Sequence, residues 1–564
     1  MTAPSVPADA VVRARAAARE RLLNAAAREL EVPPGGPGPW RLDLLESGAL
    51  VAEVIGWSPS GHHRWGEEIV LDTGSHTRTV SHEEFVHLLL SQLDAALPDP
   101  CPPDPCLPDP CLPDPCRAPT DRVGALGAQV RTSVARTARY LAAPVRPEPA
   151  DAAGRTRHAE QAVRTGHPFH PAPKSIEGVD HEAADRFAPE LGVSFRRHHL
   201  AVHPDLVVEE RVAPGPWTPD DVAVHAPDGW SVLPVHPWQI THLRGLPGTS
   251  ALLADGRLRD LGPLGAPVYP TSSVRTVCDP AFPTAWKLPL HLRITNFVRT
   301  IPVEHARRAV DASRLVSSLR PGWPAPGFEV LIETGWRGVD PAVVGEDEAE
   351  DLVTLFRENP FVVDPAAPRV LAGLLEPGPR GEEPALVGEV RASGGDAEAW
   401  LRAYLAVSLV PMLAIFGVHG LGFEAHLQNT LLHTEDGVPA RFWVRDMEGA
   451  HVSRDRLPAG LDAASPLVYD EDEAWQRLRY HAVVNGLSSV VAALGAALPP
   501  GEPALWRVVA EVLAEVTGPG APYAADLLTS PALPAKANLL SRFAGRGESP
   551  LYVDLPNPIR KAAG

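Results

Sequence analysis

Residues 424–449 read EAHLQNTLLHTEDGVPARFWVRDMEG, and the rest of the predicted fold is arranged around this stretch. Two short β-prone runs flank Asp436-Gly437, a dipeptide that favours the tight turn of a hairpin. The stretch therefore predicts two antiparallel strands, with the beginning of the first beside the end of the second.

Polar side chains gather at the open end of this predicted hairpin. Because side chains alternate between the two faces of a strand, we expect His426 and Gln428 to share one face of the first strand. Asp446 and Glu448 should likewise share one face of the second strand. One imidazole, two amides and two or three carboxylates would then converge, which suits a magnesium-bound triphosphate. The alternative is a polar hairpin with a solvated face.

Size and composition indicate a soluble globular protein with more than one subdomain. The chain of 564 residues exceeds what one hydrophobic core usually supports, and it is 44% hydrophobic and 21% charged. The formal net charge of −19 argues against nucleic acid or an anionic membrane as a partner. An anionic substrate would have to be attracted by a local basic pocket.

Two stretches bear on localisation. Residues 1–23 contain no apolar core of the signal-peptide type, so we expect a cytoplasmic protein. The least charged run, residues 403–423, has the length of a membrane span, but Pro411, His419 and three glycines interrupt it. A buried core helix is therefore expected there.

Four of the five cysteines lie in an internal repeat, CPPDP-CLPDP-CLPDP-C, at Cys101, Cys106, Cys111 and Cys116. This spacing is no CxxC metal pattern, and such proline density favours an extended polyproline segment. We therefore expect a disordered Pro/Cys-rich insert near residues 97–119, in preference to a metal site or disulfides. Cys278 is expected to be structural.

The periodicity of the chain predicts an α+β fold in three regions. In the first, we expect a helix over 8–32, strands over 40–72, a helix opened by a capping box of Ser81 and Glu84, and a helix over 123–142. The second region is rich in strands and loops. The third is mainly helical around the hairpin, with helices expected over 399–418, 473–497, 503–517 and 535–544.

Two rigid His-Pro elements precede the hairpin. In Gly166-His-Pro-Phe-His-Pro-Ala-Pro-Lys174, three prolines hold His167, His170 and Lys174 within one short loop. Its lysine can meet a phosphate or carboxylate, and a histidine can exchange a proton near neutral pH. The alternative is a surface turn whose histidines cap backbone groups. The second element, PVHPWQ at 234–239, is a weaker candidate.

Two further stretches could bind a polyanion. The hydroxyls and arginine of TSSVRT at 271–276 can donate several hydrogen bonds to phosphate, although the stretch could also be an ordinary polar turn. In WKLPLHLRIT at 286–295, strict alternation predicts a strand with a cationic face that carries Lys287, His291 and Arg293. Its alternative is an edge strand with a solvated basic face.

The chain lacks the G-x-S-x-G elbow, the H-E-x-x-H pair, the Rossmann glycine fingerprint and the GxxxxGK[ST] loop. Nothing in it therefore predicts a serine hydrolase, a zinc protease, a nicotinamide enzyme or a Walker-type nucleotide site. Cationic strands and a carboxylate hairpin remain, and together they favour Mg-nucleotide chemistry.

In this order, the clusters resemble those of the IucA/IucC family of NRPS-independent siderophore synthetases. The resemblance covers roughly residues 150–545. The matching motifs are GHPFHPAPK at 166–174, HPWQ at 236–239, SSVRT at 272–276, KLPLHLRITNFVRT at 287–300, EAHLQN at 424–429, RDMEG at 445–449 and KANLLSRF at 536–543.

The resemblance implies a three-part, hand-like architecture and an acid–amine ligase. A thumb-like subdomain would span residues 1–149, a fingers-like subdomain 150–345 and a palm-like subdomain 346–564. ATP and Mg2+ would serve to adenylate a carboxylate, such as citrate, a citrate derivative or a succinyl-hydroxamate. An amine, N-hydroxy-diamine or alcohol would then displace AMP. A homodimer is also implied.

The resemblance also implies roles for individual residues. Arg299 would stabilise charge between the α-phosphate and the acid, Lys536 would help to bind the acid, and His426, His167 and His170 are catalytic candidates. The expected ATP-binding residues are Ser273, Arg275, Thr276, Lys287, Lys174, Gln428 and Asn429. The expected magnesium ligands are Asp446 and Glu448, with Glu424 as an addition.

One departure and two alternatives accompany the resemblance. Members often carry a basic residue shortly after the loop lysine, whereas this chain has Glu177. A kinase-like phosphotransferase could also hold magnesium with Asn429 and Asp446, although the chain lacks a Gly-rich phosphate loop and an HRD-type base. The third possibility is a non-catalytic protein that binds a carboxylate or siderophore.

Overall fold

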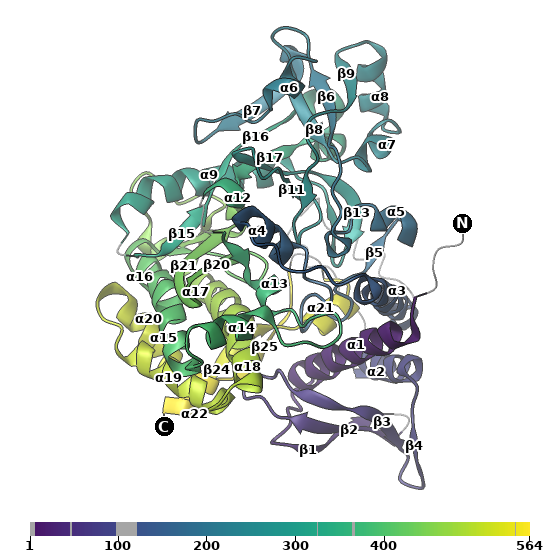
Figure 1. Ribbon diagram of the computed structural model, residues 1–564, viewed down its shortest axis with the longest axis vertical. Coiled ribbons are helices and arrows are strands. Elements are labelled where there is room, and N and C mark those ends of the chain that lie inside the picture. Colours follow the sequence, from purple (N-terminus) through teal and green to yellow (C-terminus); the bar gives the residue numbers. More distant parts are fainter. Residues whose placement is uncertain are drawn as a thin grey trace.

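The computed structural model describes residues 6–45, 48–96, 121–323, 325–363, 367–546 and 549–563. The fold is mixed α+β. In Figure 1 the N-terminal segment (purple) lies at the lower right, a strand-rich middle segment (teal) at the top, and C-terminal helices (green to yellow) at the left. The expected Pro/Cys-rich insert lies outside the described residues.

The N-terminal segment packs three helices and an antiparallel meander around one core. Its elements are α1 (Ala8–Glu29), α2 (His82–Ala96), α3 (Arg122–Ala142), β1 (Gly38–Leu44), β2 (Gly48–Gly56), β3 (Arg64–Asp72) and β4 (Thr77–Thr79). The predicted helices and strands of this region are confirmed, and the Glu84 N–H donates to Ser81 Oγ at 3.2 Å at the start of α2. The C-terminal helix α21 (Asn538–Phe543) joins this core through Leu539 and Phe543.

The middle segment contains three sheets. A six-stranded sheet has the order β10 (Tyr269–Pro270), β11 (Thr276–Cys278), β12 (Thr284–Lys287), β17 (Thr354–Glu358), β16 (Glu333–Val339) and β7 (Val207–Arg211). The others are β8 (Ser231–Val235), β6 (His198–Val202) and β9 (Leu258–Pro263), and β14 (Phe297–Arg299), β13 (Leu290–Ile294) and β5 (Ile176–Glu177). Cys278 is buried in β11, as expected.

The single cationic strand predicted over 286–295 is wrong. The chain leaves β12 after Lys287 and enters β13, in another sheet, at Leu290. Pro289, between them, has no N–H to continue a ladder. Lys287 is therefore separated from His291 and Arg293, and it lies in the sheet beside Thr276, its partner on β11.

The C-terminal segment holds the predicted hairpin in a four-stranded sheet. The order is β15 (Phe328–Leu331), β21 (Val438–Arg445), β20 (Thr430–Glu435) and β18 (Arg369–Val370), with β15 parallel to β21. Smaller sheets contain β19 (Leu421–Gly422), β22 (His451–Ser453) and β23 (Val468–Tyr469), and β24 (Ala532–Lys536) and β25 (Tyr552–Pro556).

Two of the predicted C-terminal helices are confirmed and two are corrected. The helix expected over 473–497 runs as α17 (Glu471–Leu478), a π-helical segment (Arg479–Leu487) and α18 (Ser488–Ala497), and α19 is Glu502–Ala514. The helix expected over 399–418 is divided at Ser408 into α15 (Ala397–Val407) and α16 (Leu409–His419), because Pro411 cannot donate a backbone hydrogen bond to Val407. Of the helix expected over 535–544, Ala535 and Lys536 belong to β24, and the helix α21 covers Asn538–Phe543.

The remaining helices join the strands of the three segments. They are α4 (Ala152–Glu160), α5 (His181–Asp185), α6 (Asp220–Ala223), α7 (Gln239–Leu243), α8 (Pro247–Ala254), α9 (Val303–Leu319), α10 (Pro341–Val344), α11 (Glu346–Ala349), α12 (Pro360–Val363), α13 (Leu371–Leu375), α14 (Ala385–Ala392), α20 (Ala521–Thr529) and α22 (Pro558–Ala563).

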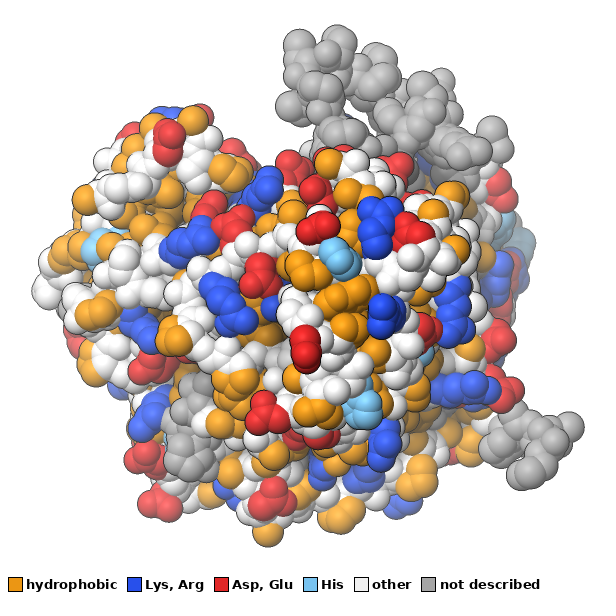
Figure 2. All heavy atoms as spheres, turned by 90° about the horizontal axis from the view of Figure 1, so that it is seen from above, with side chains coloured by type: hydrophobic (Ala, Val, Ile, Leu, Met, Phe, Trp, Pro, Cys, Tyr) orange, Lys and Arg blue, Asp and Glu red, His pale blue; other side chains and the backbone are white. Residues whose placement is uncertain are grey.

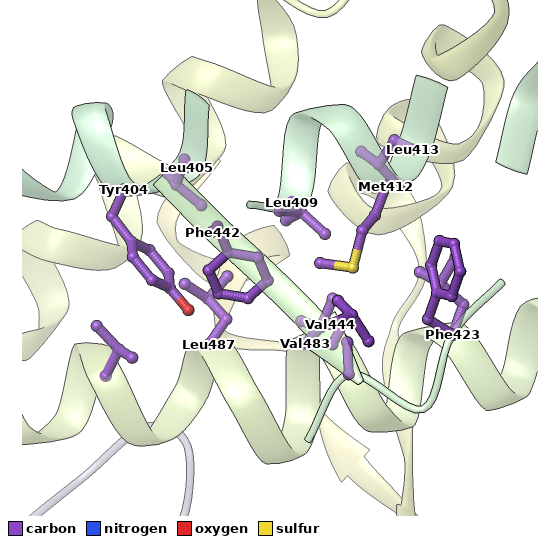
Figure 3. Packing of buried hydrophobic residues seen from close by; sticks show 14 of the residues in the cluster. Tyr404, Leu405, Leu409, Met412, Leu413, Phe423, Phe442, Val444, Val483 and Leu487 are labelled. Carbon is purple, nitrogen blue, oxygen red and sulfur yellow. The ribbon is translucent and has the colours of Figure 1, made fainter. Parts of the chain in front are cut away.

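Strand β21 runs through the largest hydrophobic core. Figure 3 shows Phe442 and Val444 of β21 between Tyr404 and Leu409 on one side and Val483 on the other. By length and composition alone, the helical stretches Ala397–His419 and Glu471–Ala497 could cross a membrane. However, 56% and 78% of their most apolar windows are buried inside the protein, as in core helices.

Candidate functional site

A cavity of about 3630 Å³ lies between the N-terminal helices, the middle sheets and the C-terminal hairpin. It is lined by all fifteen residues for which the sequence predicts a role: His167, His170, Lys174, Ser273, Arg275, Thr276, Lys287, Arg299, Glu424, His426, Gln428, Asn429, Asp446, Glu448 and Lys536. The outer face in Figure 2 instead carries acidic and basic side chains interspersed.

The hairpin forms as predicted, but its polar ends are not strands. Strands β20 and β21 pair from Thr430↔Val444 to Glu435↔Val438, and the turn residues Asp436 and Gly437 have φ of 50° and 81°. His426 and Gln428 precede β20 in a loop and turn, so the prediction that they share a strand face is wrong.

Asp446 and Glu448 likewise follow β21 rather than lie on it. Asp446 has φ 72°, a left-handed conformation that an aspartate tolerates, and a 3₁₀ turn covers Met447–Gly449. The ladder cannot continue through such a residue. Both carboxylates nevertheless contact one group, the Lys287 ammonium, with Nζ 2.7 Å from Asp446 Oδ1 and 3.0 Å from Glu448 Oε2.

Electrostatics keep these two carboxylates ionised. Burial alone would raise the pKa of Asp446, but the charges of Lys287 and Arg357 outweigh it and hold the pKa well below its usual range. Burial is outweighed in the same way at Glu448, where Lys287 and His305 lower the pKa. His305 Nδ1 lies 3.1 Å from Glu448 Oε1.

A buried ion pair supports the Asp446 turn from behind. Arg357 on β17 lies 2.6 Å from Glu333 and 3.1 Å from Asp446 Oδ1. The other Glu333 oxygen accepts the Met447 N–H at 3.1 Å. Sequence reasoning missed Arg357, Glu333 and His305, since they belong to no recognisable motif and meet the hairpin only through the fold.

The TSSVRT stretch forms a tight turn between β10 and β11, with Val274 at φ 68°. Glu160, at the end of α4, accepts both the N–H and the hydroxyl of Ser272 at 3.0 Å. The same carboxylate pairs with Arg445 at 2.5 Å, and both residues are almost fully buried. Glu160, which the sequence did not indicate, therefore links this turn to the hairpin.

Two arginines lie together on the adjoining wall. Arg275 Nη1 donates to the carbonyls of Arg299 and Thr300 at 2.8 and 2.9 Å, and Arg299 Nη2 donates to Thr295 Oγ1 at 2.9 Å. Burial, and then the nearby Arg275 charge, lower the pKa of Arg299 to about 10, so the Arg299 guanidinium remains cationic at neutral pH. With Lys287 the two arginines form a positive cluster opposite the two carboxylates.

The first His-Pro loop is held by hydrogen bonds. His170 Nδ1 accepts the Ala172 N–H at 3.1 Å, and its Nε2 lies 3.0 Å from Asn296 Oδ1. Burial lowers the pKa of His170 to about 4, so the ring is neutral with the proton on Nε2. Lys174 Nζ contacts Glu190 at 2.5 Å and is already paired.

The His167 and His426 imidazoles lie near the hairpin loop. His167 Nε2 is 2.8 Å from Asn485 Nδ2, and burial lowers the pKa of both His167 and His426. The His426 ring centroid lies 5.9 Å from that of His481. Both imidazoles are therefore neutral at pH 7.

The remaining predicted residues lie around the same loop. Glu424 Oε1 is 3.2 Å from His481 Nε2, and its side chain lies against Gly449, where a Cβ would come within 2.5 Å of Glu424 Oε2. Lys536, at the end of β24, lies over the Tyr480 ring at 5.2 Å, and burial lowers its pKa.

Glu177, the acidic residue that departs from the expected family pattern, lies beside cationic side chains. The Glu177 carboxylate lies 3.7 Å from Arg293 and 3.5 Å from Arg542, and it accepts Gln129 Nε2 at 2.7 Å. Its charge is therefore partly compensated where it lines the cavity.

Comparison with known proteins identifies relatives that match most of the chain. Residues 155–376 match the model described as the IucA / IucC family, and residues 398–551 match a model described as ferric iron reductase FhuF-like transporter. An L-2,3-diaminopropanoate–citrate ligase of Staphylococcus aureus is 34% identical over 96% of each chain. A rhizobactin siderophore biosynthesis protein of Rhizobium meliloti is 29% identical over 89% of each chain.

Solved structures of siderophore-biosynthesis proteins have a similar fold. ATP-bound aerobactin synthetase IucA from a hypervirulent pathotype of Klebsiella pneumoniae has a TM-score of 0.80 and 25% identity over 96% of this chain and 99% of that one. The petrobactin biosynthesis protein AsbB of Bacillus anthracis, at 15% identity, has a TM-score of 0.79 over 98% and 96% of the two chains, which shows the shared fold.

Proposed function

Since this chain belongs to the IucA/IucC family, whose members are siderophore synthetases, we propose that its cavity is where ATP activates a carboxylic acid that is then condensed with an amine. The chain is an ATP-dependent ligase of siderophore biosynthesis, and its relatives include named citrate ligases. We propose citrate or a citrate derivative as the acid and a diamine or amino acid as the nucleophile.

One observation carries this proposal: Lys287, Arg275 and Arg299 face Asp446 and Glu448 within a single cavity. Three cations can bind the oxygens of a triphosphate. The two ionised carboxylates that they face can bind its magnesium. The ATP-bound relative with the same fold supports this use of the cavity.

Magnesium fits the residues present. Mg2+ prefers carboxylate oxygens, and Asp446 Oδ1 and Glu448 Oε2 already converge on one cation, the Lys287 ammonium. We propose these two as its ligands, with Glu424 less directly involved because it lies against His481. The bound ion would neutralise phosphate charge.

The proposed chemistry has two steps. A carboxylate oxygen of the acid bonds to the α-phosphorus of ATP while the bond to the β-phosphate oxygen breaks, which releases pyrophosphate. The amine nitrogen then bonds to the acyl carbon, AMP leaves, and the nitrogen gives up a proton. Arg299 would stabilise the charge that develops at the α-phosphate, and Lys536 would hold the acid.

His426 is the better candidate to accept that proton. A lowered pKa keeps its imidazole neutral, and a neutral imidazole can act as a base. His170 engages both ring nitrogens in hydrogen bonds, so it would position the loop instead. His167 would position Asn485 and the substrate.

The other predicted residues complete the nucleotide site in this proposal. Ser273 and Thr276 would add hydroxyl donors at the phosphates, and Gln428 and Asn429 would line the nucleotide. Lys174 would reach a phosphate only after leaving Glu190.

We also propose the hand-like arrangement of the family, with a thumb-like part at 1–149, fingers-like at 150–345 and palm-like at 346–564. Buried apolar clusters cross both bounds of this proposed division. Leu539 and Phe543 pack with the N-terminal helices, Phe328 and Val330 with the C-terminal core, and Leu355 and Phe356 with the middle segment. A cytoplasmic homodimer remains part of the proposal.

The deciding experiment supplies the purified chain with MgATP, citrate and a panel of diamines and amino acids that includes 2,3-diaminopropanoate. Citrate-dependent release of AMP and pyrophosphate is expected. Release of ADP and phosphate instead would favour the kinase-like alternative. Nucleotide binding without turnover of any acid–amine pair would favour a non-catalytic binding protein.

A further inference from the structure

Two histidines and an aspartate converge in the middle segment, away from the carboxylates of the hairpin. His242 lies on α7, His291 on β13, and Asp351 in the 3₁₀ turn Glu350–Leu352. His242 Nε2 is 2.9 Å from Asp351 Oδ2, and His291 Nδ1 is 3.0 Å from the same oxygen. One ligand atom from each residue lies within 4.8 Å of the others.

These three side chains are held in place by their surroundings. Gln239 Nε2 donates to Asp351 Oδ1 at 2.8 Å, and Gln239 Oε1 accepts the His291 N–H at 2.8 Å. The rings of His242 and His291 stack with centroids 4.0 Å apart. The last residue of the HPWQ motif is therefore explained by its contacts with this cluster.

The Asp351 carboxylate lacks a permanent cation. It is only 2% exposed, and among the described residues its ion-pair partners are His242 and His291 alone. Neither imidazole is a permanent cation, and a buried carboxylate charge needs a charged partner or a metal. A divalent cation would compensate it fully.

From this geometry we propose that His242, His291 and Asp351 form a binding site for a late first-row divalent metal ion, with Zn2+ as the representative. Two imidazole nitrogens and one carboxylate oxygen suit such an ion and disfavour Mg2+, which prefers oxygen ligands. Metal–ligand distances of about 2.0–2.1 Å place tetrahedral ligands about 3.3 Å apart. The hydrogen-bonded contacts of 2.9–3.0 Å need to open only slightly.

The bound ion would be accessible to solvent and would stiffen one wall of the cavity. The His291 side chain is 44% exposed and lines the cavity, so a fourth position is open to water. Strand β13 pairs with β14, where Leu290 opposes Arg299. Ligation of His291 would tie this pair of strands to α7 and to the Asp351 turn, and so stiffen the cavity wall that carries Arg299.

Metal binding to the full chain, free of any affinity tag and treated with a chelator, tests this proposal. Co2+ serves as a spectroscopic probe and Zn2+ is counted by mass spectrometry after dialysis. We expect one ion per chain, visible absorption bands from Co2+, and a higher Tm in its presence. His242→Ala should lose all three, and far-UV circular dichroism checks that this variant folds.

Two matched variants locate the ion. His198→Ala removes a histidine of β6 that lies 2.5 Å from Asp260 of β9, and this variant should bind Co2+ like the wild type. Asp446→Asn should also bind it normally, which separates this site from the nucleotide site and from the proposed function. Absence of stoichiometric binding in the wild type, unchanged binding in His242→Ala, or loss of binding in Asp446→Asn would overturn the proposal.

Discussion

The ammonium of Lys287 lies 2.7 Å from Asp446 Oδ1, although 159 positions of sequence separate the two residues. The same ammonium lies 3.0 Å from Glu448 Oε2. A lysine expected at the triphosphate thus lies between the two expected magnesium ligands.

Replacement of Lys287 tests this relationship. Lys287→Met leaves two neighbouring carboxylates without their closest cation, and we expect a loss of about 2–3 kcal/mol in the free energy of unfolding. Added Mg2+ should raise the Tm of this variant more than that of the wild type, since the ion can take the place of the ammonium. Arg391→Met, at an exposed pair with Glu383, is the control and should change stability little. Equal Mg2+ effects in variant and wild type would contradict the assignment of both carboxylates to the metal.

The pH dependence of stability follows from the same contacts. The pKa values of Asp446 and Glu448 are lowered from 3.8 and 4.5 in the folded protein, so their ionic contribution is fully present above these values. It is lost as the pH falls through the folded pKa values. The difference in Tm between wild type and Lys287→Met should therefore be constant from about pH 8 to 6 and should shrink below about pH 4.5. A difference that grows on acidification would be inconsistent with this pairing.

Removal of the Arg299 guanidinium should abolish adenylation. Arg299→Ala loses hydrogen bonds to Ile294 O and Thr295 Oγ1 but little core packing, so the fold should persist. We expect ATP–pyrophosphate exchange to fall by at least about 100-fold, as when one group that stabilises transition-state charge is removed. Arg314→Ala, an exposed arginine of α9, should exchange at the wild-type rate. Exchange near the wild-type rate in Arg299→Ala would rule out the proposed role.

Glu160 should matter for both stability and nucleotide affinity. Glu160→Ala leaves the buried Arg445 unpaired and frees the Ser272 turn, and we expect a loss of about 3–5 kcal/mol in the free energy of unfolding. Because Glu160 holds the turn and does not line the cavity, Glu160→Gln should keep the fold better and mainly raise the KM for ATP. A fall in kcat at unchanged KM would argue against positioning.

Loss of the His426 imidazole should affect the second step more than the first. His426→Ala should retain citrate-dependent pyrophosphate exchange while amide formation falls by about 100-fold, as expected when a proton acceptor is removed. His170→Asn, which can preserve part of the hydrogen bonding in the loop, is the comparison. If both variants lose the exchange step equally, His426 acts before the amine attacks.

Local patterns predicted much of the architecture because short-range chemistry decides them. The Asp436-Gly437 turn, the Ser81 cap and the N-terminal helix follow from residues close in sequence, and all three are confirmed. Period-two alternation could not reveal that Pro289 ends one strand and that the next belongs to another sheet. Nor could it predict the left-handed Asp446, which ends the strand face.

By itself, the sequence determined the hairpin, the family and the residue types that gather at the cavity, since motif order and turn chemistry are written along one chain. Only the tertiary structure decided which charges meet. The fold brings together residues that are far apart in the sequence. These are Lys287 and Asp446, Glu160 and Arg445, and Asp351 with His242 and His291. Their electrostatic energies depend on distance and burial, and neither quantity can be read from spacing in the sequence.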